Sequence, residues 1–197
     1  MRRFLITATA TVICLAAITA RGDDCVFSPD LITKITGQAE AGSVASQYLL
    51  GEIYANGWGV TENDARAVIW LHKSAEQGHA KAQYKLGTMY DYGMGVPMDY
   101  MEAARWYGMA AVQGDVSAQI NMGVMFGKGE GVPQDYVLGY AWTNIARASG
   151  AETAHKNMRV LVRRMTSDQI AEAQKLSREI WGRIDASKQK VEEAASE

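Results

Sequence analysis

The chain has little cysteine and little histidine. Of its 197 residues, two are cysteines and three are histidines. Cys14 and Cys25 both lie near the N-terminus, so the fold cannot depend on disulfides within the rest of the chain. His72, His79 and His155 lack the spacing of a zinc-binding helix, and no cysteine pair supplements them. We therefore predict no metal site.

Catalytic motifs are missing as well. No serine stands in a Gly-x-Ser-x-Gly elbow. The Gly-x-Gly pairs lie between expected helices rather than after a strand, and Lys128 alone between Gly127 and Gly129 does not make a Walker motif. Methionine and tryptophan fall mostly at positions that core packing explains. We predict no catalytic residue and no cofactor, and we favour a protein that is not an enzyme.

The chain also lacks an excess of positive charge. Its 20 basic and 22 acidic residues give a formal net charge of -2. No basic patch with interleaved aromatic residues occurs, so nucleic acid is not an expected partner. The hydrophobic and charged fractions are ordinary for a globular protein.

What the chain does have is a repeat with a fixed step of 36 residues. The blocks 42–77, 78–113 and 114–149 align without a gap. A period of this size indicates a solenoid built from one supersecondary unit. Seven positions are identical in all three blocks: Gly42/Gly78/Gly114, Gln47/Gln83/Gln119, Gly51/Gly87/Gly123, Gly57/Gly93/Gly129, Gly59/Gly95/Gly131, Val60/Val96/Val132 and Trp70/Trp106/Trp142.

Each block predicts two helices separated by a glycine-rich break. In the second block, apolar residues from Ala82 to Tyr90 recur on one helical face. The break follows at residues 93–97, and Asp99 is the expected N-cap of the second helix.

A glycine inside the first helix of every block departs from helix propensity, at a cost of about 1 kcal/mol against alanine. Three such glycines at one phase indicate a close helix approach. We expect the tryptophan of each block to pack against the bare backbone, that is Trp70 on Gly51, Trp106 on Gly87 and Trp142 on Gly123.

These motifs resemble the Sel-one-like repeat family, relatives of the tetratricopeptide repeats. The matching run, from Ala82 to Gly114, is A-Q-x-x-L-G-x-M-Y-x-x-G-x-G-V-P-x-D-Y-x-x-A-x-x-W-Y-x-x-A-A-x-Q-G. The resemblance implies an all-α fold, a right-handed α-α superhelix of antiparallel helix pairs. It also implies a concave groove lined by the first helices, which in such families binds another protein.

Residues on both sides of the repeats are expected to cap the solenoid, since an open end would expose its stacking face. Residues 28–41 fall in register with a second helix and predict an N-terminal capping helix. Residues 150–185 predict C-terminal capping helices. We expect a disordered linker over 21–27, and a tail over 186–197 that is either a frayed helix or disordered.

The first twenty residues have the form of a secretory signal peptide. Arg2 and Arg3 precede an uncharged, apolar stretch that ends at Ala20. The alternative is an uncleaved inner-membrane anchor formed by residues 4–20. Cleavage would leave Cys25 as a single thiol and no stable membrane insertion.

Six positions on the first helices are candidates for contact with a partner because they point away from the second helix. Tyrosine brings apolar area and a hydroxyl to an interface at low entropic cost. Packing between repeats is the alternative, which stays open for the tyrosines and is favoured for the repeated glutamines. The candidates are Tyr48, Glu52, Tyr84, Thr88, Ile120 and Val124.

Taken together, the sequence predicts an exported interaction scaffold in the periplasm of a Gram-negative bacterium. Its expected partner is another protein or a peptide held in the groove. Two alternatives remain: a weak β-lactamase-like or penicillin-binding hydrolase, which some relatives suggest, and a secreted factor that contacts a host.

Overall fold

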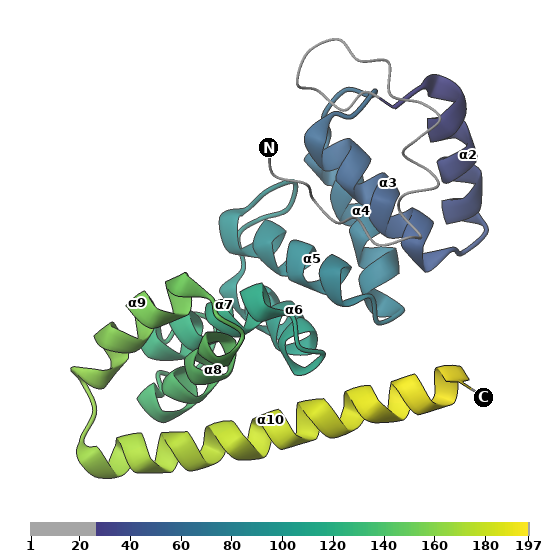
Figure 1. The fold of residues 1–197 in the computed structure, drawn as a ribbon. Coiled ribbons are helices and arrows are strands. Elements are labelled where there is room, and N and C mark those ends of the chain that lie inside the picture. The colour runs from purple at the N-terminus through teal and green to yellow at the C-terminus, as the bar shows by residue number, and fades with distance from the viewer. Residues whose placement is uncertain (1–26, 197) are drawn as a thin grey trace, which may run out of the picture.

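The computed structural model describes residues 27–196, without the side chains of 191, 192 and 194–196. Over this range the chain forms nine helices and no strand, which confirms the all-α prediction (Figure 1). The expected signal peptide or anchor and Cys25 lie outside the described residues. The helices are α2 (Pro29–Glu40), α3 (Val44–Asn56), α4 (Asp64–Glu76), α5 (Ala80–Tyr92), α6 (Tyr100–Val112), α7 (Val116–Lys128), α8 (Tyr136–Ala148), α9 (Glu152–Val162) and α10 (Ser167–Ser196).

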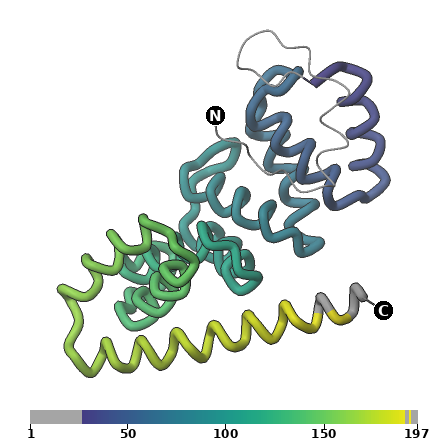
Figure 2. The backbone as a smooth tube through the Cα atoms, in the orientation of Figure 1, coloured from purple at the N-terminus to yellow at the C-terminus, as the bar shows by residue number. Residues whose placement is uncertain are grey.

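The helices stack in chain order as a right-handed α-α superhelix. The closest partners are the two helices of each repeat, α3 with α4, α5 with α6 and α7 with α8. Each second helix then packs on the first helix of the next repeat, as the backbone trace in Figure 2 shows. α2 packs on α3 and buries Ile35 and Ala39, so it occupies the place of a second helix ahead of the first repeat.

The turns inside the repeats follow from their sequence. Asn63, Asp99 and Asp135 cap the second helices by accepting hydrogen bonds from backbone N–H groups of the first turn. The first helix of the second repeat ends at Gly93, whose φ of 68° is left-handed and favours glycine. The helix pair can therefore reverse direction within a few residues.

The glycine inside each first helix meets the second helix of its own repeat. A Cβ atom on Gly87 would lie 2.7 Å from Cδ1 of Tyr107, and one on Gly51 would lie 2.6 Å from Cγ of Leu71. A Cβ on Gly123 would meet the hydroxyl of Thr143. The close approach is thus confirmed at all three glycines.

The prediction that tryptophan fills these contacts is wrong. The contacting residue is the one that follows each tryptophan, and neighbouring residues on a helix point about 100° apart. Trp106 is 1% exposed and packs with Leu71 and Leu86 in the core between α4, α5 and α6. Its ring lies 5.3 Å from that of His72. Trp106 therefore packs with the preceding repeat, whereas Tyr107 contacts the first helix of its own repeat and also packs in the core shared with the third repeat.

Phe27 lies at the N-terminal boundary of the fold. Its ring is 5.9 Å from that of Trp58, and its carbonyl lies against Gly59. Phe27, which falls within the expected linker over 21–27, therefore packs on the first repeat.

The C-terminal end differs from the repeats. α9 follows in phase as a fourth first helix and contacts α7 and α8. α10 is 30 residues long, about 45 Å, and packs mainly on α8. Ile184 and Lys188 reach Gly114, at the turn between α6 and α7, so α10 runs back along the solenoid (Figure 1). Residues 186–196, expected as a frayed or disordered tail, continue this helix.

Replacing Gly87 by alanine tests the close approach. The new methyl group would press on the buried ring of Tyr107, and overpacking of this kind costs about 1–3 kcal/mol. We expect the Gly87→Ala variant to have a lower free energy of unfolding than the wild type. Gly108→Ala is the matched control, because Gly108 is also helical but its Cβ would meet nothing within 4 Å. The free energy of unfolding of Gly108→Ala should equal that of the wild type or exceed it by up to about 1 kcal/mol. Equal effects in urea unfolding would contradict the close approach.

Candidate partner-binding groove

The six candidate residues lie on the first helices, two each on α3, α5 and α7. Five of them are half-buried, and Glu52 is 8% exposed. We call the surface that they form on these three helices the groove face. Their surroundings decide which of them can meet a partner.

Tyr48 and Glu52 connect the first repeat to the second. The Tyr48 ring lies 4.7 Å from the ring of His79, the N-cap of α5. Burial raises the pKa of the Tyr48 hydroxyl, and the nearby Glu52 carboxylate raises it further. Oε2 of Glu52 lies 3.2 Å from Nζ of Lys85 on α5. Both residues therefore help to hold two repeats together, as the packing alternative expects.

Tyr84 and Thr88 contact the second helix of their own repeat. The ring of Tyr84 lies 5.9 Å from that of Tyr107. The Tyr107 hydroxyl lies 3.3 Å from Oγ1 of Thr88 and 3.2 Å from Oδ2 of Asp91. Burial is the main cause of the raised pKa of Tyr107. The hydroxyl of Thr88 also donates to the Tyr84 carbonyl, so its side chain already has internal partners.

Ile120 and Val124 continue the groove face on α7. Val124 borders a cavity of about 360 Å³ between α7 and α9, within the usual range of ligand pockets. None of the other five candidates lines this cavity. It is bounded by Gly123, Val124, Gly127, Lys128, Gln134, Tyr136, Asn157, Val160, Leu161 and Arg164. We call it the α7–α9 pocket.

The repeated glutamines join neighbouring repeats rather than face a partner. The Nε2 groups of Gln47, Gln83 and Gln119 donate to carbonyls of the preceding second helix. The Oε1 atoms of Gln47 and Gln83 accept from Gln77 and Gln113, both at 2.7 Å.

The third repeat breaks this arrangement. Ser149 stands where the first two repeats have glutamine, and Oε1 of Gln119 is buried without a hydrogen-bond partner. The packing role favoured for the glutamines agrees with these contacts.

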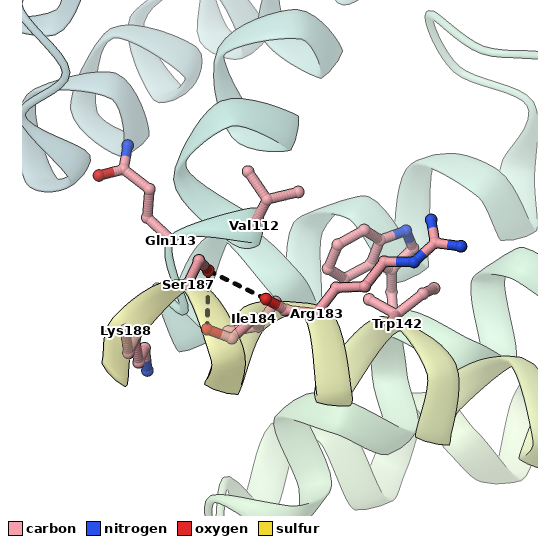
Figure 3. A pocket seen from close by; sticks show the side chains of 8 residues that line it. Val112, Gln113, Trp142, Arg183, Ile184, Ser187 and Lys188 are labelled. Atoms are coloured by element: carbon pink, nitrogen blue, oxygen red, sulfur yellow. Dashed lines mark hydrogen bonds between the residues drawn. The ribbon is translucent and has the colours of Figure 1, made fainter. Parts of the chain in front are cut away.

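A second cavity, of about 750 Å³, lies between α10 and the turn from α6 to α7 (Figure 3). Val112, Trp142 and Ile184 give it an apolar wall, and Arg183 and Lys188 lie beside them. The Ser187 hydroxyl is hydrogen-bonded to the carbonyls of Arg183 and Ile184. No candidate residue lines this cavity. Sequence reasoning missed it because the 36-residue pattern stops before α10 and does not place that helix.

An exposed apolar surface on the second repeat was also missed. Tyr92, Met94, Met98 and Met101 are 72%, 39%, 59% and 70% exposed. The positions that match Tyr92 and Met98 are Asn56 and Glu62 in the first repeat, and Lys128 and Gln134 in the third. A comparison of the three aligned blocks for apolar residues in the loop would have revealed it.

Within residues 27–196, no group of three or more His, Cys, Asp or Glu side chains is placed to hold a metal ion. In that same range, no helix combines the length and the apolar character that crossing a bilayer requires.

This architecture defines an α-solenoid of stacked helix pairs. The Sel1 repeat matches residues 44–79, 80–115 and 116–150, which together make up just over half of the chain. The chain therefore belongs to the Sel1 repeat family. The matched segments have the same 36-residue step as the blocks read from the sequence and begin two residues later.

Solved structures agree with this assignment. A Sel1 repeat protein from Oxalobacter formigenes is 39% identical, with a TM-score of 0.60, over 65% of this chain and 96% of that one. A protective antigen present in uropathogenic Escherichia coli strains, with an SLR fold, is 28% identical with a TM-score of 0.52. The alignment covers 81% of this chain but only 43% of the antigen.

Cysteine rich protein B of Helicobacter pylori shares the fold, at 18% identity and a TM-score of 0.52, over 64% of this chain and 92% of that one. A comparison with curated proteins found no match.

Ser149→Gln should restore the missing contact in the third repeat. Its Nε2 group would donate to the buried Oε1 of Gln119, as Gln77 and Gln113 do in the earlier repeats. We expect a gain of about 1 kcal/mol in the free energy of unfolding, the usual net value of one hydrogen bond. The same change in a Gln119→Met background should give no gain. An equal gain in both backgrounds would contradict this account.

His79 should make stability depend on pH. Its Nδ1 accepts from the backbone N–H of Ala82, which requires a neutral ring. Burial first, and then the charge of Lys81, lower the pKa of His79. The unfolded chain therefore binds the proton more readily, and stability present above about pH 6.5 is lost as the pH falls below that value.

His79→Ser provides the comparison, because Ser43 caps the equivalent helix in the first repeat. Urea unfolding at several values between pH 7.5 and pH 5 should show a smaller loss for His79→Ser than for the wild type. Parallel losses would show that His79 contributes nothing to the pH dependence.

Proposed function

We propose that this chain is an exported interaction scaffold that holds a segment of another protein against its groove face. Sel1 repeat proteins generally act in protein–protein interaction. The observation that carries the proposal is the register of the repeats. Three first helices stack in order and present equivalent residues at a constant step of 36. A periodic surface of this kind suits an extended partner that contacts several repeats in turn.

The groove face supports binding mainly towards its C-terminal end. Tyr48 and Glu52 are engaged between the first two repeats, and Tyr84 and Thr88 within the second. Val124 borders an open cavity. A partner would therefore bind most favourably at α7 and α9. The surface is hollowed there, and Val124 can contact a partner through the cavity.

Export rests on the form of residues 1–20, with two arginines before an uncharged apolar stretch. Periplasmic localisation follows if this segment is cleaved. A similar structure belongs to a protective antigen of uropathogenic Escherichia coli, which supports secretion and contact with a host as a second candidate role. No contact in the described residues favours the hydrolase alternative, so it is not proposed.

Site-specific photo-crosslinking in cells that produce the protein tests the proposal. A photoreactive amino acid at Ile120 or Val124 should give a crosslinked species of defined mass. The same group at Ile69 or Met109, which are exposed on the second helices α4 and α6, should not. The crosslinked chain should be recovered from the periplasmic fraction and begin after residue 20. Crosslinks that do not distinguish the two sets of positions would count against a groove-face partner, and a chain that retains residues 1–20 would count against cleavage.

A further inference from the structure

The contact between successive first helices changes along the solenoid. Between α3 and α5 it contains the ion pair of Glu52 and Lys85, with 3.2 Å between Oε2 and Nζ. The repeat register places Val124 and Asn157 at the equivalent positions between α7 and α9. The equivalent positions between α5 and α7 are Thr88 and Asn121, so neither of the two later contacts has residues that could form this ion pair.

A glycine on α7 lets Leu161 of α9 approach the α7 backbone closely. Gly127 occupies the position of Ala55 in the first repeat and Asp91 in the second. Asp91 has a side chain that meets the Tyr107 hydroxyl, whereas Gly127 has none. Cδ2 of Leu161 lies 2.9 Å from where a Cβ on Gly127 would stand. Leu161 therefore packs directly on the α7 backbone and forms a wall of the α7–α9 pocket.

The wall of the pocket is apolar, and part of it is exposed. Val124, Val160 and Leu161 supply the apolar surface. Val160 is 58% exposed although it stands beside a cavity of about 360 Å³. Burying the exposed part of this side chain against another apolar group is favourable, because it removes apolar surface from water. An apolar group of a partner could therefore bury surface of Val160 that the chain itself leaves exposed.

The rim of the pocket is positively charged. Lys128 and Arg164 line it, and no acidic residue does. Nη1 of Arg164 donates to the Tyr136 hydroxyl at 3.1 Å, and no carboxylate within the described residues pairs with this guanidinium. Lys128 pairs with Glu130 at 3.1 Å, but both side chains are more than one-third exposed, and such pairs contribute little. The rim can therefore accept a carboxylate from outside.

We infer that the α7–α9 pocket is an anchoring site for a partner peptide that carries a large apolar side chain next to a carboxylate. The apolar side chain would enter the pocket and pack against Val124, Val160 and Leu161. The carboxylate would bind Arg164 in the paired geometry that a guanidinium favours. This inference rests on the proposed function, because it places the occupant on the groove face and names its chemistry.

A random linear peptide display library, selected on the purified full chain, provides the probe. Enriched peptides should share a Leu, Ile, Met or Phe beside an Asp or Glu. A synthetic peptide of that consensus should bind at least tenfold more weakly to Val124→Phe, which fills the pocket, and to Arg164→Glu, which reverses the charge at its rim. Ile69→Phe and Arg163→Glu are the matched controls, since both residues are exposed and neither lines the pocket. Thermal unfolding should establish that every variant is folded.

Three results would overturn the inference. The first is enrichment of peptides that lack the apolar–acidic pattern. The second is an affinity that neither Val124→Phe nor Arg164→Glu changes. The third is the absence of any enriched peptide. If the affinity falls instead in Tyr48→Phe or Tyr84→Phe, or in Ile120→Ala, the groove face remains the binding surface and only the anchoring pocket fails. If none of these variants changes it, the proposed function fails as well.

Discussion

Each repeat depends on the contact of a first-helix glycine with the side chain of its partner helix. At Gly87 the Tyr107 ring lies where a β-carbon would otherwise stand, and Gly51 meets Leu71 in the same way. A glycine inside a helix costs about 1 kcal/mol. The closer approach offsets this cost by burying the opposing side chain completely, since Leu71 and Tyr107 are 1% and 0% exposed. Because the two helices are so close, the loop between them can be short and built around glycine.

Stacking between repeats uses a different set of contacts. Trp106 packs in the core shared by the first two repeats, and Gln83 links α5 to the carbonyl of Ala75 on α4. The glutamine bond to the preceding helix recurs at Gln47 and Gln119, whereas the donor that is missing at Ser149 belongs to a bond within the third repeat. Gly127 stands in the third repeat where the first two repeats have Ala55 and Asp91. The α7–α9 pocket lies beside Gly127, between the third repeat and α9.

The sequence could place most of the candidate residues on the first helices. It could not show which of them already have contacts within the chain. The phase of the helices was enough to place Tyr48, Tyr84 and Val124 on first helices. It could not show that Tyr48 rests on His79 or that Tyr84 rests on Tyr107, because these contacts depend on the rotation between helices. The assignment of tryptophan to the glycine contact failed for the same reason. One step along a helix changes the direction of a side chain by about 100°, which is the difference between Trp106 and Tyr107.

The sequence by itself determined the number of repeats, the type and order of their helices, and the presence of a half-repeat ahead of them. Local chemistry is sufficient for this, because caps, glycine turns and apolar periodicity act within one unit and repeat with it. Only the tertiary structure decided where α10 lies. That helix has an apolar stripe but no repeat register, and packing on α8 rather than on α9 follows from the surface that the finished solenoid leaves exposed. The two cavities were likewise decided by tertiary packing, because each is bounded by helices that do not directly follow one another in the chain.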